Sequence, residues 1–513
     1  MDFENCPLKD VLDLSFQDDV RKELELLENQ IITRGASKIT YQLEDSLSAP
    51  IFTKDPSDWE LIISGCHEAN LQLLQERLKA LKPLTLSIKE RRKLAGRVAE
   101  LLETKRAQLV ALLILEVGKP IYEADAEIAE AIDFCNYYSL LLEKLSPQVT
   151  FNSEWERCTL FYEPKGVAAV ISPWNFPIAI PLGMIIANLL VGNPVVFKPA
   201  EQANLCGFTV YSLLLEAGWP EEALIFAPGL GETVGDFLVK SAWVDLVMFT
   251  GSKAVGSLIQ KNCSNTPSRN GFKKVIAEMG GKNAIFVDKS VDCRKAVEIV
   301  LASAFGYAGQ KCSACSRLFV HNEIYEQFME PFLEAVKSLR VGSARDFETF
   351  LPFLINEEAY HRVQKILDSI NKEGIRILAN SLYPVTRNAK FVPAYVLEAP
   401  PEGSSLDEEL FAPIISVYRV ANFQEALPKI NSTPYALTGG VITKSRETAD
   451  LAIKYFNCGN LYINRKITGA FVGRHPFGGR KFSGIGFKAG GPNYLIQLVN
   501  EKLVAELDYA SLC

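Results

Sequence analysis

The first part of the chain has mainly the hydrophobic pattern of helices. Ser87 and Glu90 form a capping-box pair, and apolar residues follow them at helical spacing. Gly118 and Pro120 then stand in the order that is typical of residues just beyond a helix end. A second, acidic helix is predicted over residues 124–142. We therefore expect a mainly helical N-terminal region.

From Gly166 onward the pattern changes to short apolar runs that alternate with helical segments. Such alternation predicts parallel sheets covered on both faces, and a break near Gly280–Gly281 divides it into two α/β units. Before them, β-prone runs at 149–151 and 159–162 flank a polar centre and predict a hairpin. The apolar runs interpreted as strands are GVAAVISP, PVVFKP, ALIFAPG, VDLVMFTG, AIFVD and SRLFV.

Length and composition agree with a folded protein of several domains. At roughly 150 residues per domain, the 513 residues correspond to about three modules. Hydrophobic residues make up 48% and charged residues 22%, the balance of a globular protein rather than a disordered or fibrous one. Because the formal charge of −7 offers no basic surface, we expect no nucleic-acid partner.

The chain shows no signal for a membrane or for export. Its most apolar stretch, 177–192, is interrupted by Pro181 and Asn188 and is shorter than the roughly 18 residues of a spanning helix. The N-terminus is acidic and lacks the apolar centre of a secretory signal. Eleven scattered cysteines, an odd number, indicate reduced thiols. These features predict a cytoplasmic enzyme without a membrane partner.

The most suggestive local motif contains Cys312 and Cys315, in GQKCSACSR. A dithiol redox pair would be expected near the start of a small βαβ unit. Zinc needs about four ligands, and no second CxxC or histidine pair is present, so we expect no metal. From the motif alone, two interpretations stay open: a single nucleophilic thiol and buried structural cysteines.

Two motifs at predicted strand ends could contact a nucleotide. Gly251 and Ser252, in GSKAVG, follow a strand and open a helix whose first N–H groups can bind phosphate. Lys198 ends another strand in FKPAE, and Glu201 could accept hydrogen bonds from a ribose diol. Taken alone, an ordinary turn and a solvated ion pair are the simpler explanations.

Two further residues are candidates for acyl chemistry. Asn175 lies in PWNFP, a loop stiffened by proline on both sides, and could donate a hydrogen bond to an oxyanion. Glu278 lies in AEMGGKN and could activate water against a thioester. The simpler alternatives are a packed turn with a capping Asn175 and an exposed Glu278.

Together, these motifs resemble those of the aldehyde dehydrogenase superfamily. The resemblance covers about residues 91–504 and consists, in chain order, of PWNFP, KPAE, FTGSKAVG, EMGGKN, GQKCSACSR, EELFAP and PFGG. The KCSACSR form and three more stretches resemble its pyrroline-5-carboxylate dehydrogenase (glutamate-semialdehyde dehydrogenase) branch, in the monofunctional form: EADAEIAEAIDF, NRKITGA and SGIGFKAGGPNYL.

The resemblance implies a role for each matching residue. The catalytic residues would be Cys312 as nucleophile, Glu278 as general base for deacylation and Asn175, which shares the oxyanion hole with the Cys312 N–H. The residues that would bind the implied cofactor, NAD, are Lys198, Glu201, Ser252, Gly251, Trp174, Glu409 and Phe411. Those that would bind an amino-acid aldehyde are Ser313, Gly490 and Gly491 at its α-carboxylate, Glu130 at its α-amino group and Phe176 along its chain.

The chain departs from the family pattern in three places. Leu498 stands where an aromatic residue of the pocket is usual, and Tyr307–Ala308 replaces Phe-Gln before GQKC. Residues 1–85 match poorly. These departures affect the expected substrate fit and N-terminal contacts rather than the chemistry.

The activity implied by the resemblance is the NAD-dependent oxidation of L-glutamate γ-semialdehyde, formed from 1-pyrroline-5-carboxylate, to L-glutamate. This is the second step of proline catabolism and proceeds through a thiohemiacetal and a thioester on cysteine. Glu201 favours NAD over NADP because a carboxylate would repel a 2′-phosphate. The alternatives are a dehydrogenase of another semialdehyde, such as succinate semialdehyde, and a non-catalytic binding protein. The length leaves no room for a proline oxidase domain.

The implied fold is α/β, with two doubly wound domains and a β-hairpin flap. The expected NAD-binding domain, with its helical N-terminal region, spans 1–146 and 164–281, and the expected catalytic domain spans 282–495. The expected oligomerisation flap spans 147–163 and 496–513. Because a flap of this kind exposes strand edges that another subunit can pair, we expect a homodimer or a larger homo-oligomer.

Overall fold

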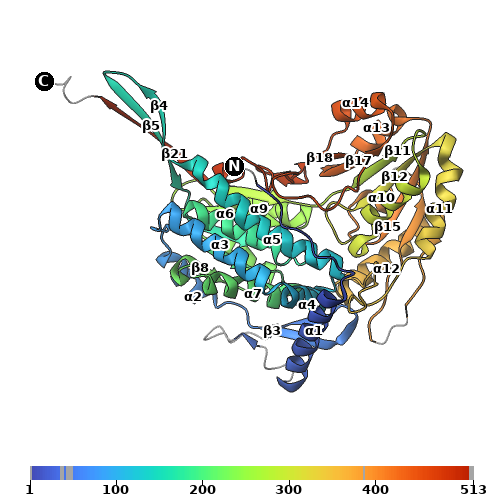
Figure 1. The fold of residues 1–513 in the computed structure, drawn as a ribbon, viewed down its shortest axis with the longest axis horizontal. Coiled ribbons are helices and arrows are strands. Elements are labelled where there is room, and N and C mark those ends of the chain that lie inside the picture. Colours follow the sequence, from blue (N-terminus) through green and yellow to red (C-terminus); the bar gives the residue numbers. More distant parts are fainter. Residues whose placement is uncertain (1–2, 35–39, 42–49, 385–387, 402, 508–513) are drawn as a thin grey trace.

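A computed structural model describes residues 3–34, 40–41, 50–384, 388–401 and 403–507 of the chain. Two large, mostly parallel sheets lie side by side, and a small three-stranded sheet projects from the first (Figure 1). The expected α/β fold with two sheets and a flap is therefore confirmed. The outermost residues of the expected ranges, 1–2 and 508–513, lie outside the described residues.

The N-terminal region contains the predicted helices and also a sheet that the hydrophobic pattern did not predict. The capping box of Ser87 and Glu90 is present at the start of α3, and Gly118 ends α4 in the left-handed conformation, with φ 63°. The elements are α1 (Leu14–Arg34), β1 (Thr40–Tyr41), β2 (Ile51–Asp55), β3 (Asp58–Cys66), α2 (Leu71–Ala80), α3 (Ile88–Thr104), α4 (Arg106–Val117) and α5 (Ile121–Leu141).

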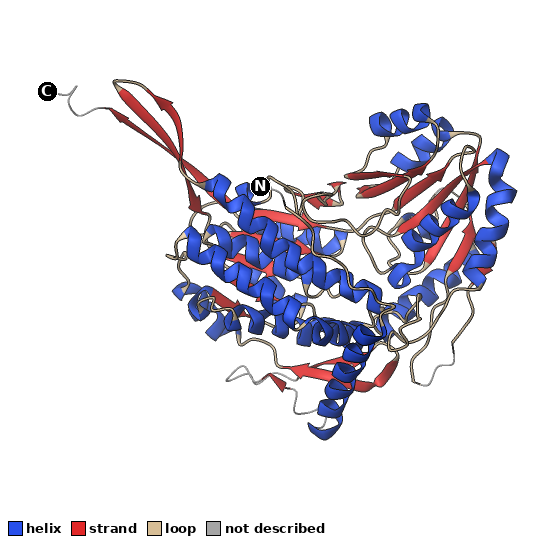
Figure 2. Cartoon of the chain, in the orientation of Figure 1, coloured by secondary structure: helices blue, strands red, loops and turns tan. Residues whose placement is uncertain are grey.

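The first large sheet has the strand order β20-β10-β9-β6-β7-β8. Its strands β6, β7 and β8 are buried at every residue, which explains their uninterrupted apolar runs. Helix α6 packs on this sheet, and α5 and α3 pack on α6 as a further layer (Figure 2). The elements are β6 (Ala168–Ile171), α6 (Ala179–Val191), β7 (Val195–Lys198), α7 (Asn204–Glu216), β8 (Leu224–Phe226), α8 (Asp236–Lys240), β9 (Leu246–Thr250), α9 (Lys253–Asn265), β10 (Lys274–Glu278) and β20 (Gly484–Ile485).

The second large sheet has the order β13-β14-β15-β12-β11-β17-β18, and only β13 runs antiparallel to its neighbour. Its elements are β11 (Asn283–Val287), α10 (Cys293–Phe305), β12 (Cys315–His321), α11 (Tyr325–Lys337), α12 (Glu357–Lys372), β13 (Ile377–Asn380), β14 (Tyr395–Glu398), β15 (Ile414–Val420), α13 (Phe423–Asn431), β17 (Thr438–Ile442), α14 (Arg446–Tyr455) and β18 (Asn460–Ile463). A separate two-stranded sheet pairs β16 (Tyr435–Ala436) with β19 (Arg480–Lys481).

One segment departs from the expected division at 281/282. Strand β20 lies within the range expected for the catalytic domain, yet it pairs antiparallel with β10 of the first sheet, Glu278 opposite Gly484. The chain therefore returns to the first sheet before it enters the flap. Two residues are too short a run to give a strand pattern, so the sequence could not show this return.

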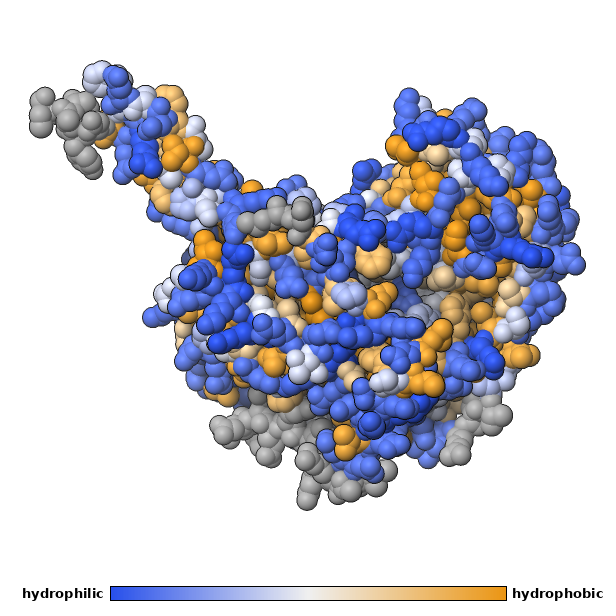
Figure 3. Space-filling model, viewed as in Figure 1, coloured by the Kyte–Doolittle hydropathy of each residue, from blue (hydrophilic) through white to orange (hydrophobic). Residues whose placement is uncertain are grey.

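The flap consists of β4 (Gln148–Asn152), β5 (Glu156–Pro164) and β21 (Val499–Leu507). The predicted hairpin is confirmed as β4 and β5, and β21 adds nine paired residues along the other edge of β5. Apolar side chains lie on the surface of this projecting arm (Figure 3). The large exposed apolar residues among them are Val149, Phe151, Trp155, Leu503 and Leu507.

Neither paired thiols nor a metal cluster occurs among the residues that the structure describes. The ten cysteines within them are free, and no three potential ligands gather to hold a metal ion there. In the same part of the chain, no helix has the length and apolar character needed to cross a membrane.

The base of the flap is fixed by Asn193, which is fully buried. Its Nδ2 donates to the carbonyl oxygen of Leu498 (2.9 Å) and to Asn188 Oδ1 (3.0 Å), and its Oδ1 accepts from the Gly166 N–H (3.0 Å). One amide thus joins α6, the start of the first sheet and the residue before β21.

We expect Asn193→Ala to lower the unfolding temperature by several degrees. The change leaves a carbonyl and an N–H buried without partners, which costs about 3 kcal/mol. Differential scanning calorimetry would measure the shift. Asn500→Ala is the matched control, because the Asn500 side chain is exposed and, within the part of the chain that the structure describes, accepts from Lys165 Nζ at 2.7 Å. Equal unfolding temperatures for the two variants would contradict this role of Asn193.

Candidate active site

The turn that carries Cys312 is held by an amide from the neighbouring strand. Asn283, the first residue of β11, donates from Nδ2 to the carbonyl oxygens of Cys312 (2.7 Å) and Ala314 (2.9 Å). Its Oδ1 accepts from the Thr438 N–H (3.0 Å), and Thr438 Oγ1 donates to the Ser313 carbonyl (3.2 Å). Two strands of the second sheet therefore fix the half-buried thiol. Sequence reasoning missed Asn283, although it lies in the EMGGKN motif.

The surroundings of Cys312 favour the neutral thiol in the resting protein. Burial raises the pKa of this thiol, and the carboxylates of Glu409 and Glu278 raise it further. The backbone N–H groups of Ser313 and of Cys312 itself point at the sulfur and lower the pKa in part. A reactive thiolate here would consequently need a nearby group that takes the proton, and Glu409 and Glu278 are close enough to affect the pKa of the thiol.

Glu278 ends β10 with one carboxylate oxygen buried. This oxygen, Oε2, has no hydrogen-bond partner among the described residues. Burial raises the pKa of Glu278 well above its usual value, while the N–H of Gly479 lowers it in part. A side chain at Gly478 would come within 2.9 Å of Oε1. A buried carboxylate that is poorly paired is a characteristic of a general base.

Asn175 is buried beside the chain that leads into the thiol turn. Its Nδ2 donates to the carbonyl oxygen of Gln310 (2.8 Å), and Gln310 Oε1 in turn accepts from the Ile355 N–H (2.9 Å). The preceding Trp174 lies edge-on to Phe411, with ring centroids 5.6 Å apart. The structure thus brings Asn175 to the segment of Cys312, as expected for a shared oxyanion site.

A buried ion pair contacts the Asn175–Phe176 loop and the start of α6. It was not among the candidates from the sequence. Lys119 and Glu127 pair with both side chains fully buried. Glu127 Oε1 also accepts from the N–H groups of Ile178 (2.8 Å) and Ala179 (3.1 Å) at the start of α6, and Lys119 Nζ lies 3.6 Å from the Phe176 ring centroid. The only sequence signal was the run of carboxylates along an otherwise apolar helix.

Lys198 and Glu201 form a second cluster, at the carboxyl end of β7. Lys198 Nζ donates to Glu201 Oε1 (2.9 Å), and the lysine side chain is almost fully buried. Added Cβ atoms at Gly231 and Gly235 would lie 3.9 Å from Glu201 Oε1 and 3.7 Å from Lys198 Cδ. The glycines therefore keep open a space that side chains would fill, next to one cation and one anion.

Gly251 and Ser252 follow the carboxyl end of β9, next to Glu278 at the end of β10. Gly251 donates its N–H to the Glu278 carbonyl oxygen (3.1 Å). Ser252 is the N-cap of α9 and accepts from the Val255 N–H (3.3 Å), which leaves the first N–H groups of the helix available for an anion. A cavity of about 270 Å³ lies on the other side of Glu201, between β2 and the start of α12. These groups fit a nucleotide cofactor.

Glu409 and Phe411 lie near the thiol and the Trp174 loop: the Glu409 carboxylate raises the pKa of Cys312, and the Phe411 ring lies edge-on to Trp174. Glu409 Oε1 accepts from the Gly281 N–H (3.0 Å), and its carboxylate occupies the place of a side chain at Gly280. Burial raises the pKa of Glu409 to about 7. Phe411 has φ 51°, a conformation that bulky residues rarely adopt. Backbone strain of this kind is concentrated at functional sites.

Of the residues expected to bind the amino-acid end of a substrate, Ser313 lies in the thiol turn, Glu130 on α5, and Gly490 and Gly491 on the loop before the flap. Burial, with Glu127 nearby, raises the pKa of Glu130 to about 8. The Gly490 N–H donates to Tyr138 Oη (2.8 Å), and the Gly491 N–H to the Lys488 carbonyl (3.2 Å). Both N–H groups thus have partners within the protein, so their contact with a substrate stays a prediction.

The residues at which the chain departs from the family pattern have structural roles. Tyr307 and Ala308 both have φ 55°, and Tyr307 is fully buried, with its hydroxyl donating to the Val117 carbonyl (2.8 Å). Leu498 is fully buried in the core around α5 and α6. Its position affects the packing of the flap base as well as any pocket wall.

Comparison with known proteins agrees with this arrangement. The 1-pyrroline-5-carboxylate dehydrogenase of Geobacillus sp. (strain WCH70) is 36% identical over 501 residues, 96% of each chain. The crystal structure of 1-pyrroline-5-carboxylate dehydrogenase from Thermus with bound NAD is 34% identical, with a TM-score of 0.92 and 99% of both chains covered. Proline utilization A from Bdellovibrio bacteriovorus inactivated by N-propargylglycine is 35% identical, with a TM-score of 0.94. The match covers 98% of this chain but only 53% of that longer one.

The expected fold and family are therefore confirmed. The aldehyde dehydrogenase family matches residues 75–504, and the stretch includes every residue discussed as catalytic or cofactor-binding. With this match and these relatives, the chain belongs to the aldehyde dehydrogenase family.

Proposed function

We propose that this protein oxidises L-glutamate γ-semialdehyde to L-glutamate with NAD as the electron acceptor. The observation that carries the proposal is the surroundings of Cys312: the Glu278 carboxylate raises the pKa of its thiol, and Asn175 donates to the carbonyl oxygen of Gln310, two residues before it. The relatives named 1-pyrroline-5-carboxylate dehydrogenase, one of them aligned over 96% of this chain, support the choice of substrate. The same relatives support a place in proline catabolism.

The cofactor would lie along the carboxyl ends of the strands of the first sheet. Lys198 and Glu201 would hold the adenosine ribose, Gly251, Ser252 and Trp174 the pyrophosphate, and Glu409 and Phe411 the nicotinamide ribose. When bound, NAD supplies the acceptor for the hydride that leaves the substrate carbon. Glu201 favours NAD over NADP, because its carboxylate would repel a 2′-phosphate.

The acylation half of the reaction is carried by Cys312. Its thiol proton passes to a neighbouring carboxylate, and the thiolate sulfur forms a bond to the aldehyde carbon. The carbonyl electron pair moves onto oxygen, and Asn175 Nδ2 and the Cys312 N–H would donate to this oxyanion. Donors fixed in advance stabilise charge that develops only during reaction. Loss of hydride from the thiohemiacetal then leaves a thioester on Cys312.

Glu278 would drive deacylation. Its carboxylate accepts a proton from water as the water oxygen bonds to the thioester carbonyl, and the C–S bond then breaks to release L-glutamate. The proton returns from Glu278 to the thiolate, while the proton first taken from the thiol and that of the product carboxylic acid pass to solvent. The unpaired oxygen of Glu278 and the raised pKa of its carboxyl suit a group that must take a proton near neutral pH.

The amino-acid end of the substrate would be held on the opposite side of the pocket. Ser313, Gly490 and Gly491 would bind its α-carboxylate, Glu130 its α-ammonium group and Phe176 its methylene chain. Such polar groups discriminate strongly against analogues that leave them unpaired. Succinate semialdehyde lacks the α-amino group and would leave Glu130 without a partner.

We further propose that two copies associate through the flap, as a cytoplasmic homodimer or larger homo-oligomer. In this proposal 1–146 and 164–281 form the NAD-binding domain, 282–495 the catalytic domain and 147–163 with 496–513 the oligomerisation flap. The exposed apolar residues of the flap and its free strand edge support this assignment.

The purified protein is expected to form NADH with 1-pyrroline-5-carboxylate, and Cys312→Ala to abolish this activity. Cys315→Ala, at a buried neighbour with no proposed role, is the control and should retain activity. Absorbance at the NADH maximum measures both. Faster turnover of succinate semialdehyde would contradict the substrate, and no turnover of any aldehyde would indicate a non-catalytic binding protein.

Glu278→Gln is expected to separate the two halves of the reaction. Acylation continues and gives a burst of about one NADH per active site, while steady-state turnover falls by roughly 10²–10⁴-fold, the usual contribution of a general base. Stopped-flow absorbance would resolve the burst. If the variant showed neither a burst nor bound acyl group, Glu278 would instead be needed for attack by the thiol.

The rate of deacylation is expected to rise with pH beyond the range in which an ordinary glutamate titrates. Burial raises the pKa of Glu278, so its basic form becomes populated only at higher pH. Single-turnover hydrolysis of the acyl-enzyme between about pH 5 and 9 would measure this. A pH-independent rate over that range would exclude Glu278 as the titrating base.

Glu130→Gln is expected to raise KM for the amino-acid aldehyde by roughly tenfold or more, with little change in kcat. Loss of a charge-assisted contact to the α-ammonium group removes about 1.5–3 kcal/mol of binding. Kinetics with propanal, which lacks that group, serve as the internal control. An equal loss with both aldehydes would show that Glu130 does not recognise the amino group.

A further inference from the structure

A single amide near the N-terminus joins helix α5 to a loop that contacts Gly490. Asn5 Nδ2 donates to Asp133 Oδ2 on α5 (2.7 Å) and to the carbonyl oxygen of Val472 (2.9 Å). Beside it, Phe3 packs on Tyr137 of α5, with ring centroids 4.9 Å apart. The segment from Phe3 to Lys9, here called the strap, thus contacts both the helix and a loop far along the chain.

The loop that Asn5 holds is in direct contact with Gly490. The Gly473 N–H donates to the Gly490 carbonyl oxygen (2.9 Å), and a side chain at Gly490 would come within 3.2 Å of Val472 Cα. The Gly490 N–H in turn donates to Tyr138 Oη on α5. The contacts therefore close a ring, from Asn5 to the 472–473 loop, to Gly490, to α5 and back to Asn5.

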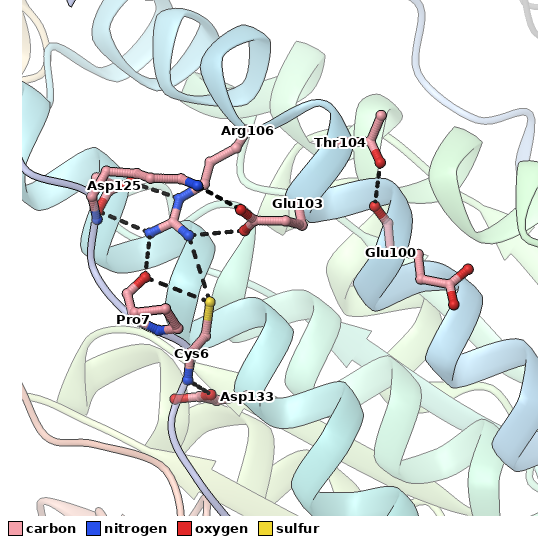
Figure 4. Close-up of polar contacts among 9 residues, drawn as sticks. Cys6, Pro7, Glu100, Glu103, Thr104, Arg106, Asp125 and Asp133 are labelled. Carbon is pink, nitrogen blue, oxygen red and sulfur yellow. Dashed lines mark hydrogen bonds and ion pairs between the residues drawn. The ribbon is translucent and has the colours of Figure 1, made fainter. Parts of the chain in front are cut away.

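The rest of the strap is fastened along α5 by buried charges (Figure 4). The Cys6 N–H donates to Asp133 Oδ1 (2.6 Å), and the Lys9 N–H to Asp125 Oδ2 (2.9 Å). Arg106 pairs with Asp125 through Nε (2.7 Å) and donates through Nη2 to the Pro7 carbonyl oxygen (3.1 Å). The position of the strap is thus set by two carboxylates of α5 that are eight residues apart.

Helix geometry places the strap and the substrate groups on different faces of α5. At about 100° per residue, Glu123, Glu127 and Glu130 lie within about 60° of one another around the helix. Asp125 lies about 140–160° from each of them around the helix, and Asp133 lies between the two faces. The strap therefore fixes α5 from behind, while its opposite face carries Glu130.

We propose that Asn5 is a positioning residue for the amino-acid end of the aldehyde. By tying α5 to the 472–473 loop, it sets the separation between Glu130 on the helix and Gly490 on the loop that contacts it. A zwitterionic substrate needs both groups at once, whereas the thiol chemistry at Cys312 needs neither. This inference rests on the proposed function, since Glu130 and Gly490 matter only if the substrate carries an α-amino acid group.

The test compares Asn5→Ala with Lys9→Met in the full-length protein. Lys9 lies at the other end of the strap, where its side chain pairs, among the described residues, with the half-exposed Glu103. For Asn5→Ala we expect KM for pyrroline-5-carboxylate to rise by roughly three- to tenfold, the effect of losing hydrogen bonds that position a site. We expect kcat and the KM for NAD to stay within twofold, and kcat/KM for propanal to be unchanged. Lys9→Met should behave as wild type with both aldehydes.

Three results would overturn the inference. The first is an unchanged KM for pyrroline-5-carboxylate in Asn5→Ala. The second is an equal loss of kcat/KM with propanal, which would indicate a general structural role. The third is an equal rise of KM in Lys9→Met. Asn5→Asp gives a second variant, because a carboxylate beside Asp133 and the Val472 carbonyl repels both. It should raise KM for pyrroline-5-carboxylate at least as much as Asn5→Ala.

Hydrogen exchange separates this inference from the proposed function. Asn5→Ala should increase exchange of the Gly473 and Gly490 amides, whichever aldehyde the enzyme oxidises, and Lys9→Met should not. If wild-type protein failed to turn over pyrroline-5-carboxylate while exchange still increased in Asn5→Ala, the substrate assignment would be wrong and the tie would stand. Unchanged exchange in Asn5→Ala would contradict the tie itself.

Discussion

The position of each proposed catalytic group depends on the short connection between β10 and β11. Glu278 ends strand β10 of one large sheet and Asn283 begins strand β11 of the other, so only four residues separate the proposed general base from the amide that holds the thiol turn. Gly280 and Gly281 make this possible, because the Glu409 carboxylate and the Cys312 carbonyl oxygen lie where their side chains would be. The site therefore requires the backbone at residues 280 and 281 to lie against these oxygen atoms, and this close approach excludes any residue larger than glycine at the two positions.

Helix α5 is a second element on which both sheets rely. Its carboxylates pair on two opposite faces: Asp125 with Arg106 on one, and Glu127 with Lys119 and Glu123 with Lys311 on the other. Removing charges from water costs free energy. In each pair this cost is offset by the close contact of the two charges or by further hydrogen bonds to backbone groups. Such pairs contribute little net stability, but they fix the orientation of the helix, because any rotation would leave a buried charge unpaired.

Much of the fold could be predicted from the sequence because its signals are local. The apolar runs became the strands of both sheets, and Ser87 begins α3 as its capping box indicates. The resemblance also identified the family. Asn283, Lys119 and Glu127 were not identified, since their roles arise from contacts between segments that only the folded chain brings together. The β20 pairing at Gly484–Ile485 was missed for the same reason.

The strand pairing in the flap has a consequence for folding during synthesis. Strand β5 pairs on one side with β4, which directly precedes it in the chain, and on the other side with β21. The second partner comes much later: at the base of the flap, Lys165 contacts Asn500, which is 335 residues further along the chain. During synthesis, the hairpin therefore leaves the ribosome with one long edge unpaired until nearly the whole protein has been translated. An unpaired edge is a template for the wrong strand. The edge of β5 is therefore open to mispairing during synthesis until β21 emerges and covers it.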